Sequence, residues 1–188
     1  MSLPRRVRIY RVKGPSGVRV LGVASGTFHV DSVEGFVRKL AQTDAEVGTV
    51  TQAFNSRRVA GVEHLVHASR LAIIAHEGGR GFASSLAIEL ICWVAAERQI
   101  YRAFEKMGVR DGSNDLALVS IGSSVSQVRK AIVKIFEDLG ATWDNSLLEM
   151  SPEKIPEIRR AFSIAREAEL APIEKIVLER VALLALEK

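Results

Sequence analysis

The chain has 188 residues, of which 47% are hydrophobic and 26% are charged, and its formal net charge is +4. This composition predicts a folded globular protein and excludes a disordered chain or a collagen-like repeat. The mild positive charge favours an anionic partner such as nucleic acid, without requiring one.

The first part of the chain is predicted to alternate strands and helices. Residues 5–12 alternate basic and apolar side chains, which is typical of a strand with one buried face. A turn and a second strand over residues 18–24 complete a predicted β-hairpin. Asp31 begins a helix, with Glu34 at the spacing of a capping box, and residues 47–54 form a third strand.

The middle of the chain is predicted to be helical. A helix over residues 59–77 ends at the glycine-rich residues 78–81, which we interpret as a flexible joint. Ser84 or Ser85 caps the next helix, which is expected to continue to about Met107. Its first half is apolar nearly all round and contains the single cysteine, Cys92, which cannot form an internal disulfide. We expect Cys92 to be an inert core residue in a reducing compartment.

The remainder adds one strand and three helices. Residues 115–122 form a buried strand, Ser124 caps the helix that follows, Ser151 caps another, and a final helix covers residues 172–186. The sum is an α/β (α+β) fold: a small mixed β-sheet with several packed helices and a helical C-terminus, in a single domain over residues 1–188. No segment has the roughly 20 apolar residues that span a bilayer. We therefore expect a cytoplasmic protein without a membrane partner.

The stretch NSRRVAGVEHLVHA, residues 55–68, concentrates polar side chains. His64 and His67 could share one helix face, but their spacing matches neither zincin motif and no further histidine cluster exists. We expect no metal and no other cofactor. No serine–histidine–acid grouping can be assembled either, so we predict no catalytic residues. An alternative is a small enzyme that uses His64 with Glu63 or Glu97.

Basic and amide side chains gather at the ends of the middle helices. Such residues can contact phosphates and the edges of unstacked bases. The plainer alternative is an ordinary solvated arginine face. The predicted RNA contacts are Asn55, Arg57, Arg58, His64, Arg80, Arg98 and Gln99.

The last helix offers two apolar sides. One can pack on the core while the other meets a protein partner. The alternative is that both sides are buried within the chain. The predicted partner-binding residues are Ile173, Ile176, Val177, Arg180, Val181 and Leu184.

Three segments together resemble a known family. These are FNSRRVAGVEHLVHA (residues 54–68), SSLAIELICWVAAERQI (residues 84–100) and AFEKMGV (residues 103–109). In order and spacing they are similar to the kinase-binding subunit of the KEOPS/EKC tRNA-modifying complex, in its archaeal form. The resemblance spans most of the chain and implies a compact α/β fold without catalytic activity.

The resemblance also implies a function. Members of this family are accessory subunits of a complex that makes threonylcarbamoyladenosine in tRNA. The subunit binds and stimulates the complex's small kinase/ATPase and captures tRNA by its single-stranded 3′ CCA end. A further alternative is a purely structural adaptor that does not contact RNA. The oligomeric state of the isolated chain is left open.

Overall fold

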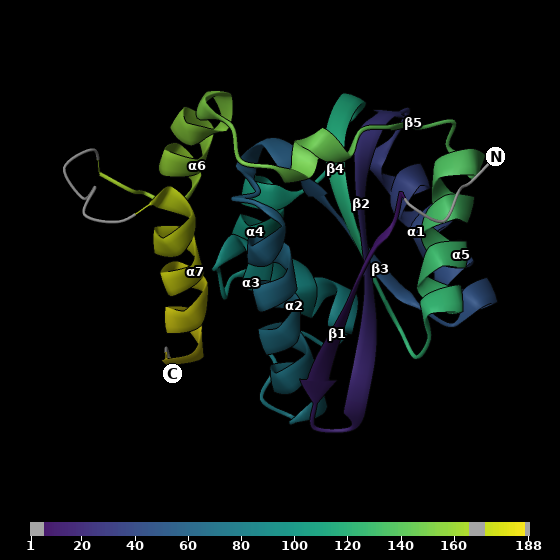
Figure 1. Ribbon diagram of the computed structural model, residues 1–188, viewed down its shortest axis with the longest axis horizontal. Coiled ribbons are helices and arrows are strands. Elements are labelled where there is room, and N and C mark those ends of the chain that lie inside the picture. The colour runs from purple at the N-terminus through teal and green to yellow at the C-terminus, as the bar shows by residue number, and fades with distance from the viewer. Residues whose placement is uncertain (1–5, 166–171, 187–188) are drawn as a thin grey trace.

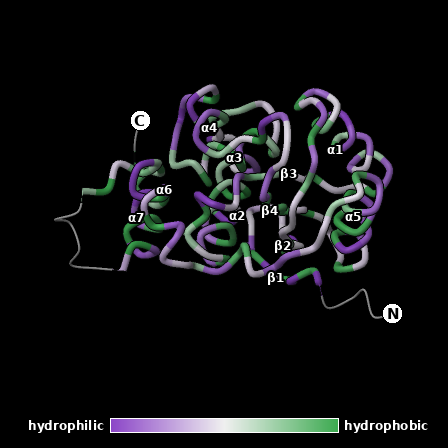
Figure 2. The backbone as a smooth tube through the Cα atoms, turned by 90° about the horizontal axis from the view of Figure 1, so that it is seen from above, coloured by the Kyte–Doolittle hydropathy of each residue, from purple (hydrophilic) through white to green (hydrophobic). Residues whose placement is uncertain are grey.

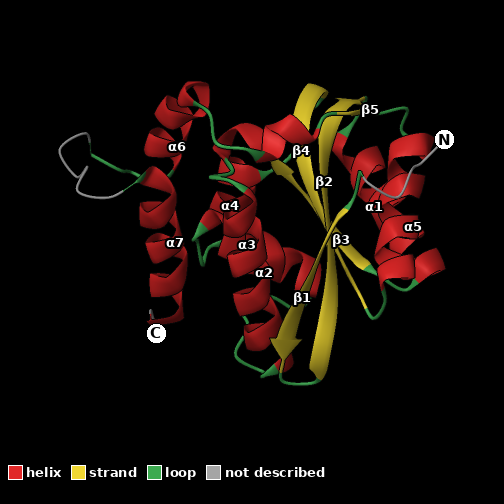
Figure 3. Cartoon of the chain, viewed as in Figure 1, coloured by secondary structure: helices red, strands yellow, loops and turns green. Residues whose placement is uncertain are grey.

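The computed structural model describes residues 6–165 and 172–186, which form a five-stranded sheet with helices on both faces (Figure 1, Figure 3). The strand order is β1-β2-β4-β3, and the short β5 pairs with β2 beyond the end of β1. The strands are β1 (Arg8–Gly14), β2 (Gly17–Val30), β3 (Val50–Asn55), β4 (Gly112–Gly122) and β5 (Thr142–Trp143).

The α/β class is confirmed, but the pairing differs from the mixed sheet that we predicted. Every pair of neighbouring strands among the described residues is antiparallel. β2 and β3 run in the same direction and are joined by a helix, as in a parallel unit. They are not neighbours, because β4 inserts between them and is antiparallel to both.

The helices form layers on either side of the sheet. Two of them cover one face, three lie on the other side, and two more lie outside these (Figure 1, Figure 2). The first pair is α1 (Val33–Val47) and α5 (Val125–Asp138). The opposite layer is α2 (Val62–Glu77), α3 (Leu86–Ala95) and α4 (Ile100–Met107). The outer helices are α6 (Ile155–Ala161) and α7 (Ile173–Leu183), and α7 packs on α2.

The period-two alternation of the central strand divides the core in two. In β4, Ala117, Val119 and Ile121 belong to the cluster on the α2–α3 side. Leu116 and Leu118 belong to the cluster under α1 and α5. From Leu116 onward both faces of β4 are buried, which explains why residues 116–119 and Ile121 are apolar without a polar–apolar alternation.

Within the described residues, no helix is long and apolar enough to cross a membrane. Short 3₁₀ segments lie near the C-terminal end of the chain. The segments are η3 (Asn145–Leu148), η4 (Pro152–Lys154) and η6 (Leu184–Leu186). Ser151 precedes η4 at the predicted position, but its side chain makes no capping hydrogen bond there.

Two predictions at the start of the chain are wrong. The N-cap of α1 is Ser32 and not Asp31, because the Ser32 hydroxyl accepts the hydrogen bond from the Gly35 amide at 3.1 Å. The second strand does not end at residue 24 but continues to Val30, where Phe28 and Val30 keep the alternation and are buried.

The long middle helix that we predicted is broken into α3 and α4. Ala96 adopts a left-handed conformation with φ 51°, in a Schellman-type end. The amide of Ala96 bonds to the Trp93 carbonyl at 3.1 Å and the amide of Glu97 to the Cys92 carbonyl at 2.9 Å. The chain therefore turns, and residues 99–102 are exposed.

Candidate functional site

The NSRR segment forms a structured corner between β3 and α2. Asn55 ends β3 and caps the 3₁₀ helix η2 (Ser56–Arg58), since its side-chain oxygen accepts a hydrogen bond from the Arg57 amide at 3.1 Å. Ser56 is buried, and its hydroxyl donates to the Asp115 carbonyl at 2.9 Å. These polar groups therefore hold the corner itself.

The two arginines of this segment are engaged within the chain. Arg57 Nε donates to Glu157 Oε1 of α6 at 2.7 Å, and this bond raises the pKa of Arg57. Arg58 Nε lies 3.9 Å from the other carboxylate oxygen, and its Nη1 donates to the Lys106 carbonyl at 2.7 Å. Arg57 and Arg58 thus tie η2 to α6 and to the end of α4.

His64 is fully buried, which contradicts its prediction as an RNA contact. Its Nδ1 accepts from the Ala60 amide at 3.1 Å, so the ring is neutral and Nε2 donates to the Val94 carbonyl at 2.9 Å. Burial lowers the pKa of His64 to about 4. Both ring nitrogens are occupied by the backbone, so the alternative of an enzyme using His64 has no acid partner in either Glu63 or Glu97.

The other side chains considered for catalysis, Glu97 and Cys92, are paired or buried. Glu97 lies 3.5 Å from the Lys106 ammonium. Cys92 is buried as predicted, and burial raises the pKa of its thiol to about 11. Within the described ranges, no three His, Cys, Asp or Glu side chains come together as metal ligands would.

Arg80 and Arg98, in contrast, meet at a cavity of about 310 Å³. The rings of Phe82 and Trp93 stack in its wall with centroids 5.5 Å apart, and the Arg98 guanidinium lies 4.9 Å from the centre of the Phe82 ring. Across the described chain, neither arginine has an ion-pair partner. Leu184, in η6, closes one side of this aromatic cavity.

A buried glutamate holds the aromatic cavity in shape. Glu89 Oε1 accepts from Trp93 Nε1 at 2.8 Å, while Oε2 accepts from the amides of Phe82 and Ala83 at 2.7 and 2.8 Å. A Cβ on Gly81 would lie 2.8 Å from this carboxylate, so glycine is needed for the close approach. The amides of Phe82 and Ala83, just after the glycine-rich residues 78–81, are therefore anchored to α3.

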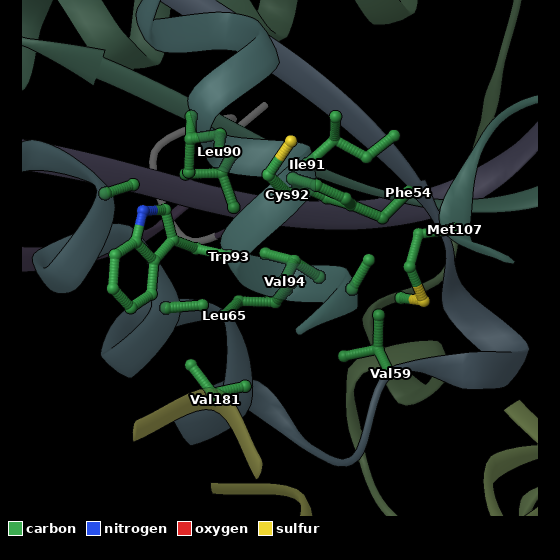
Figure 4. Packing of buried hydrophobic residues seen from close by; sticks show 14 of the residues in the cluster. Phe54, Val59, Leu65, Leu90, Ile91, Cys92, Trp93, Val94, Met107 and Val181 are labelled. Carbon is green, nitrogen blue, oxygen red and sulfur yellow. The ribbon is translucent and has the colours of Figure 1, made fainter. Parts of the chain in front are cut away.

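Sequence reasoning missed Phe82, Glu89 and Trp93. A usable signal was present, because a glutamate inside an apolar helix must find donors when it is buried. Glu89 and Trp93 are four residues apart in that helix, and Trp93 carries such a donor (Figure 4).

Gln99 completes the exposed group. It occupies the N-cap position of α4, but its side chain makes no capping hydrogen bond. Of the seven residues predicted to contact RNA, Arg80 and Arg98 line the aromatic cavity, and Gln99 is exposed and follows Arg98 in the chain. The other four, Asn55, Arg57, Arg58 and His64, are used within the fold.

The predicted partner strip on the C-terminal helix is largely buried, which contradicts that prediction. Val177, Val181 and Leu184 have 0%, 0% and 2% exposed surface and pack in the core cluster on the α2 side. Figure 4 shows Val181 in this cluster. Ile173 and Ile176 pack against the same cluster. Of the predicted residues only Arg180 is exposed, so this side of the helix serves the chain's own core.

Three of the exposed large apolar side chains lie on α4, and two more, Leu183 and Leu186, lie at the end of α7 and in η6. Ile100, Tyr101 and Phe104 are 40%, 67% and 39% exposed. Because residues four apart in a helix share a side, Ile100 and Phe104 lie together, roughly opposite Arg102 and Lys106. α4 therefore has an apolar edge and a basic edge.

Comparison with known proteins places these features in a family. A family model described as kinase binding protein CGI-121 matches residues 29–185. A curated relative, named regulatory protein Cgi121, from Methanocaldococcus jannaschii, is 29% identical over 142 residues. That alignment covers 76% of this chain and 88% of the relative.

Proposed function

The chain belongs to the CGI-121 family of kinase-binding proteins, and from this premise we propose that it is a subunit of a KEOPS-type complex. As a regulatory, kinase-binding protein it has no catalytic role of its own. In this proposal it binds and stimulates the complex's small kinase/ATPase in the cytoplasm. It contributes in this way to threonylcarbamoyladenosine synthesis on tRNA.

The second half of the proposal is that the chain recruits tRNA by its single-stranded 3′ CCA end. The observation that carries it is the aromatic cavity, where Arg80 and Arg98 border the stacked rings of Phe82 and Trp93. Unpaired bases bind proteins by stacking on aromatic rings and guanidinium planes, while arginines neutralise the adjoining phosphates. Gln99 adds an amide that can bond to a base edge.

The test compares tRNA with and without its CCA end. We expect tighter binding of the intact tRNA and at least about a tenfold loss of affinity in the double variant Arg80→Gln, Arg98→Gln. The matched control, Arg11→Gln with Lys130→Gln, removes two exposed charges elsewhere and should retain the preference. Equal affinity of the unaltered protein for both RNAs would overturn recruitment through the CCA end.

For the kinase we propose docking on the apolar edge of α4. Support comes from the concentration of exposed large apolar side chains there, since apolar and aromatic anchors dominate stable interfaces. We expect Phe104→Glu to weaken co-purification with the kinase by at least about thirtyfold. Val37→Glu alters a residue that is 49% exposed on α1, across the sheet, and is the control. Unchanged binding by the folded Phe104→Glu variant would place the kinase elsewhere.

A further inference from the structure

Besides the aromatic cavity, a basic cavity of about 470 Å³ lies between α4 and α6. Five cationic residues line it: Arg58, Arg102, Lys106, Arg110 and Arg160. They come from η2, α4, the residues after α4, and α6, so the fold brings together charges that are far apart in the sequence. Three glutamates also line this cavity and must be considered before its charge is assessed.

Two of these glutamates are already neutralised. Glu157 pairs with Arg57 and Arg58, and Glu97 pairs with Lys106. The third, Glu105, is exposed. Against it stand the exposed side chains of Arg102, Arg110 and Arg160, none of which forms an ion pair or side-chain hydrogen bond with any described residue. The cavity thus retains an excess of unpaired guanidinium groups.

The walls of this cavity are fixed by the residues that do pair. Arg58 donates to the Lys106 carbonyl at the end of α4 at 2.7 Å, and with Arg57 it holds Glu157 of α6. The Lys106 ammonium lies 4.1 Å from the centre of the Phe162 ring, just beyond α6. The cavity is therefore preformed, which lowers the cost of binding an anion there.

A smaller cavity of about 220 Å³ lies between the basic cavity and the aromatic one. It shares Glu97, Lys106 and Ala161 with the basic cavity. On its other side it is lined by Leu183, the neighbour of Leu184 in the aromatic cavity. The small cavity therefore shares lining residues with the basic cavity and has a chain neighbour in the aromatic one.

We propose that the cavity between α4 and α6 binds backbone phosphates of the same RNA whose end enters the aromatic cavity. Arg102, Arg110 and Arg160 are the contacts, because guanidinium groups bind phosphate oxygens through paired hydrogen bonds. The inference rests on the proposed recruitment of tRNA and adds a second contact to it. In this arrangement the basic cavity neutralises backbone phosphates of the RNA, and the aromatic cavity recognises its 3′ end.

The test is the salt dependence of binding, measured on the full chain with a tRNA transcript. The logarithm of the affinity falls with the logarithm of the salt concentration by about 0.7 to 0.9 for each neutralised phosphate. The triple variant Arg102→Gln, Arg110→Gln, Arg160→Gln should therefore flatten this slope by about two to three. Lysine at the same three positions keeps the charges and should restore most of it.

The control variant, Arg11→Gln, Lys13→Gln, Lys130→Gln, removes the same charge from exposed residues of β1 and α5. The inference is supported if only the cavity variant flattens the slope while the preference for the CCA end persists. An unchanged slope, or equal flattening by both variants, overturns the cavity contact and leaves end recognition standing. No binding of tRNA by the unaltered protein overturns both proposals.

Discussion

Lys154 shows how single polar residues are used inside this fold. The residue is buried, and its ammonium donates to the carbonyls of Val59, Leu147 and Glu149 at 3.0, 2.8 and 3.0 Å. Burial lowers the pKa of Lys154 to about 8. One cation thus joins η4 to the end of the NSRR corner.

His64 leads to a pH prediction at the same scale. Its pKa is about 4 when folded against 6.5 when exposed, so between these values the unfolded chain binds more protons. The free energy of unfolding should therefore fall as pH drops from about 6.5 towards 4, by up to about 3 kcal/mol. Denaturant titrations at pH 7 and 4.5 measure this loss.

The comparison that isolates His64 uses two variants. His64→Gln removes the titrating ring and should show a smaller loss of stability between pH 7 and 4.5 than the unaltered protein. His29→Gln changes an exposed histidine and should behave like the unaltered protein. An identical pH dependence in all three proteins would show that His64 does not control acid stability.

The distinction between structural and exposed arginines could not be predicted from the sequence. Arg57 and Arg98 both lie near helix starts, in equally polar surroundings. What separates them is Glu157, which is remote in sequence and reaches Arg57 only after α6 docks. The structural role of His64 could not be predicted either. Its partner is the backbone carbonyl of Val94, and since every residue has a carbonyl, the sequence does not indicate which one is bonded.

At the scale of elements, the sequence predicts those helix starts and strands that are determined by residues close together in the chain. Ser124 caps α5 as predicted, accepting from the Gln127 amide at 3.2 Å, and β4 was evident from its apolar run. The break after α3 was missed because alanine at residue 96 favours a helix and gives no stop signal. Packing overrides that preference and holds Ala96 in a left-handed conformation.

The strained turn at Ala96 leads to a stability prediction. Ala96→Gly should stabilise the protein by about 1 kcal/mol, because glycine adopts a positive φ without steric cost. The neighbouring change Ala95→Gly, at a buried helical position, should destabilise it by about 1 kcal/mol or more. Thermal unfolding of the two variants compares them directly. Destabilisation by both would mean that Ala96 is not strained.

At the scale of the whole molecule, α4 lies between two surfaces. Its apolar edge carries Ile100 and Phe104, and its basic edge carries Arg102 and Lys106, which line the cavity beside α6. Because these edges point in roughly opposite directions, a kinase and an RNA can occupy them at the same time. The sequence predicts neither edge, since its pattern continues one long helix through residues 100–107.

This arrangement predicts that the two binding activities can be separated. Phe104→Glu should abolish co-purification with the kinase and leave tRNA affinity within about twofold. The double variant Arg80→Gln, Arg98→Gln should do the reverse. Co-purification and tRNA-binding titrations on both proteins provide the four measurements. Loss of both activities in either folded variant would mean that the two surfaces overlap.

The pairing of β2 with β4 also determines how the protein must fold. Residues 20–30 pair with residues 112–122, so the central ladder of the sheet cannot close until most of the chain is available. Contacts this distant in sequence slow folding, because a long loop must be ordered first. During synthesis the β1–β2 hairpin emerges early, with one edge of β2 unpaired. Until β4 is synthesised, the nascent chain therefore exposes unpaired backbone groups along β2 that can pair with other chains. Chaperones are most needed during this period.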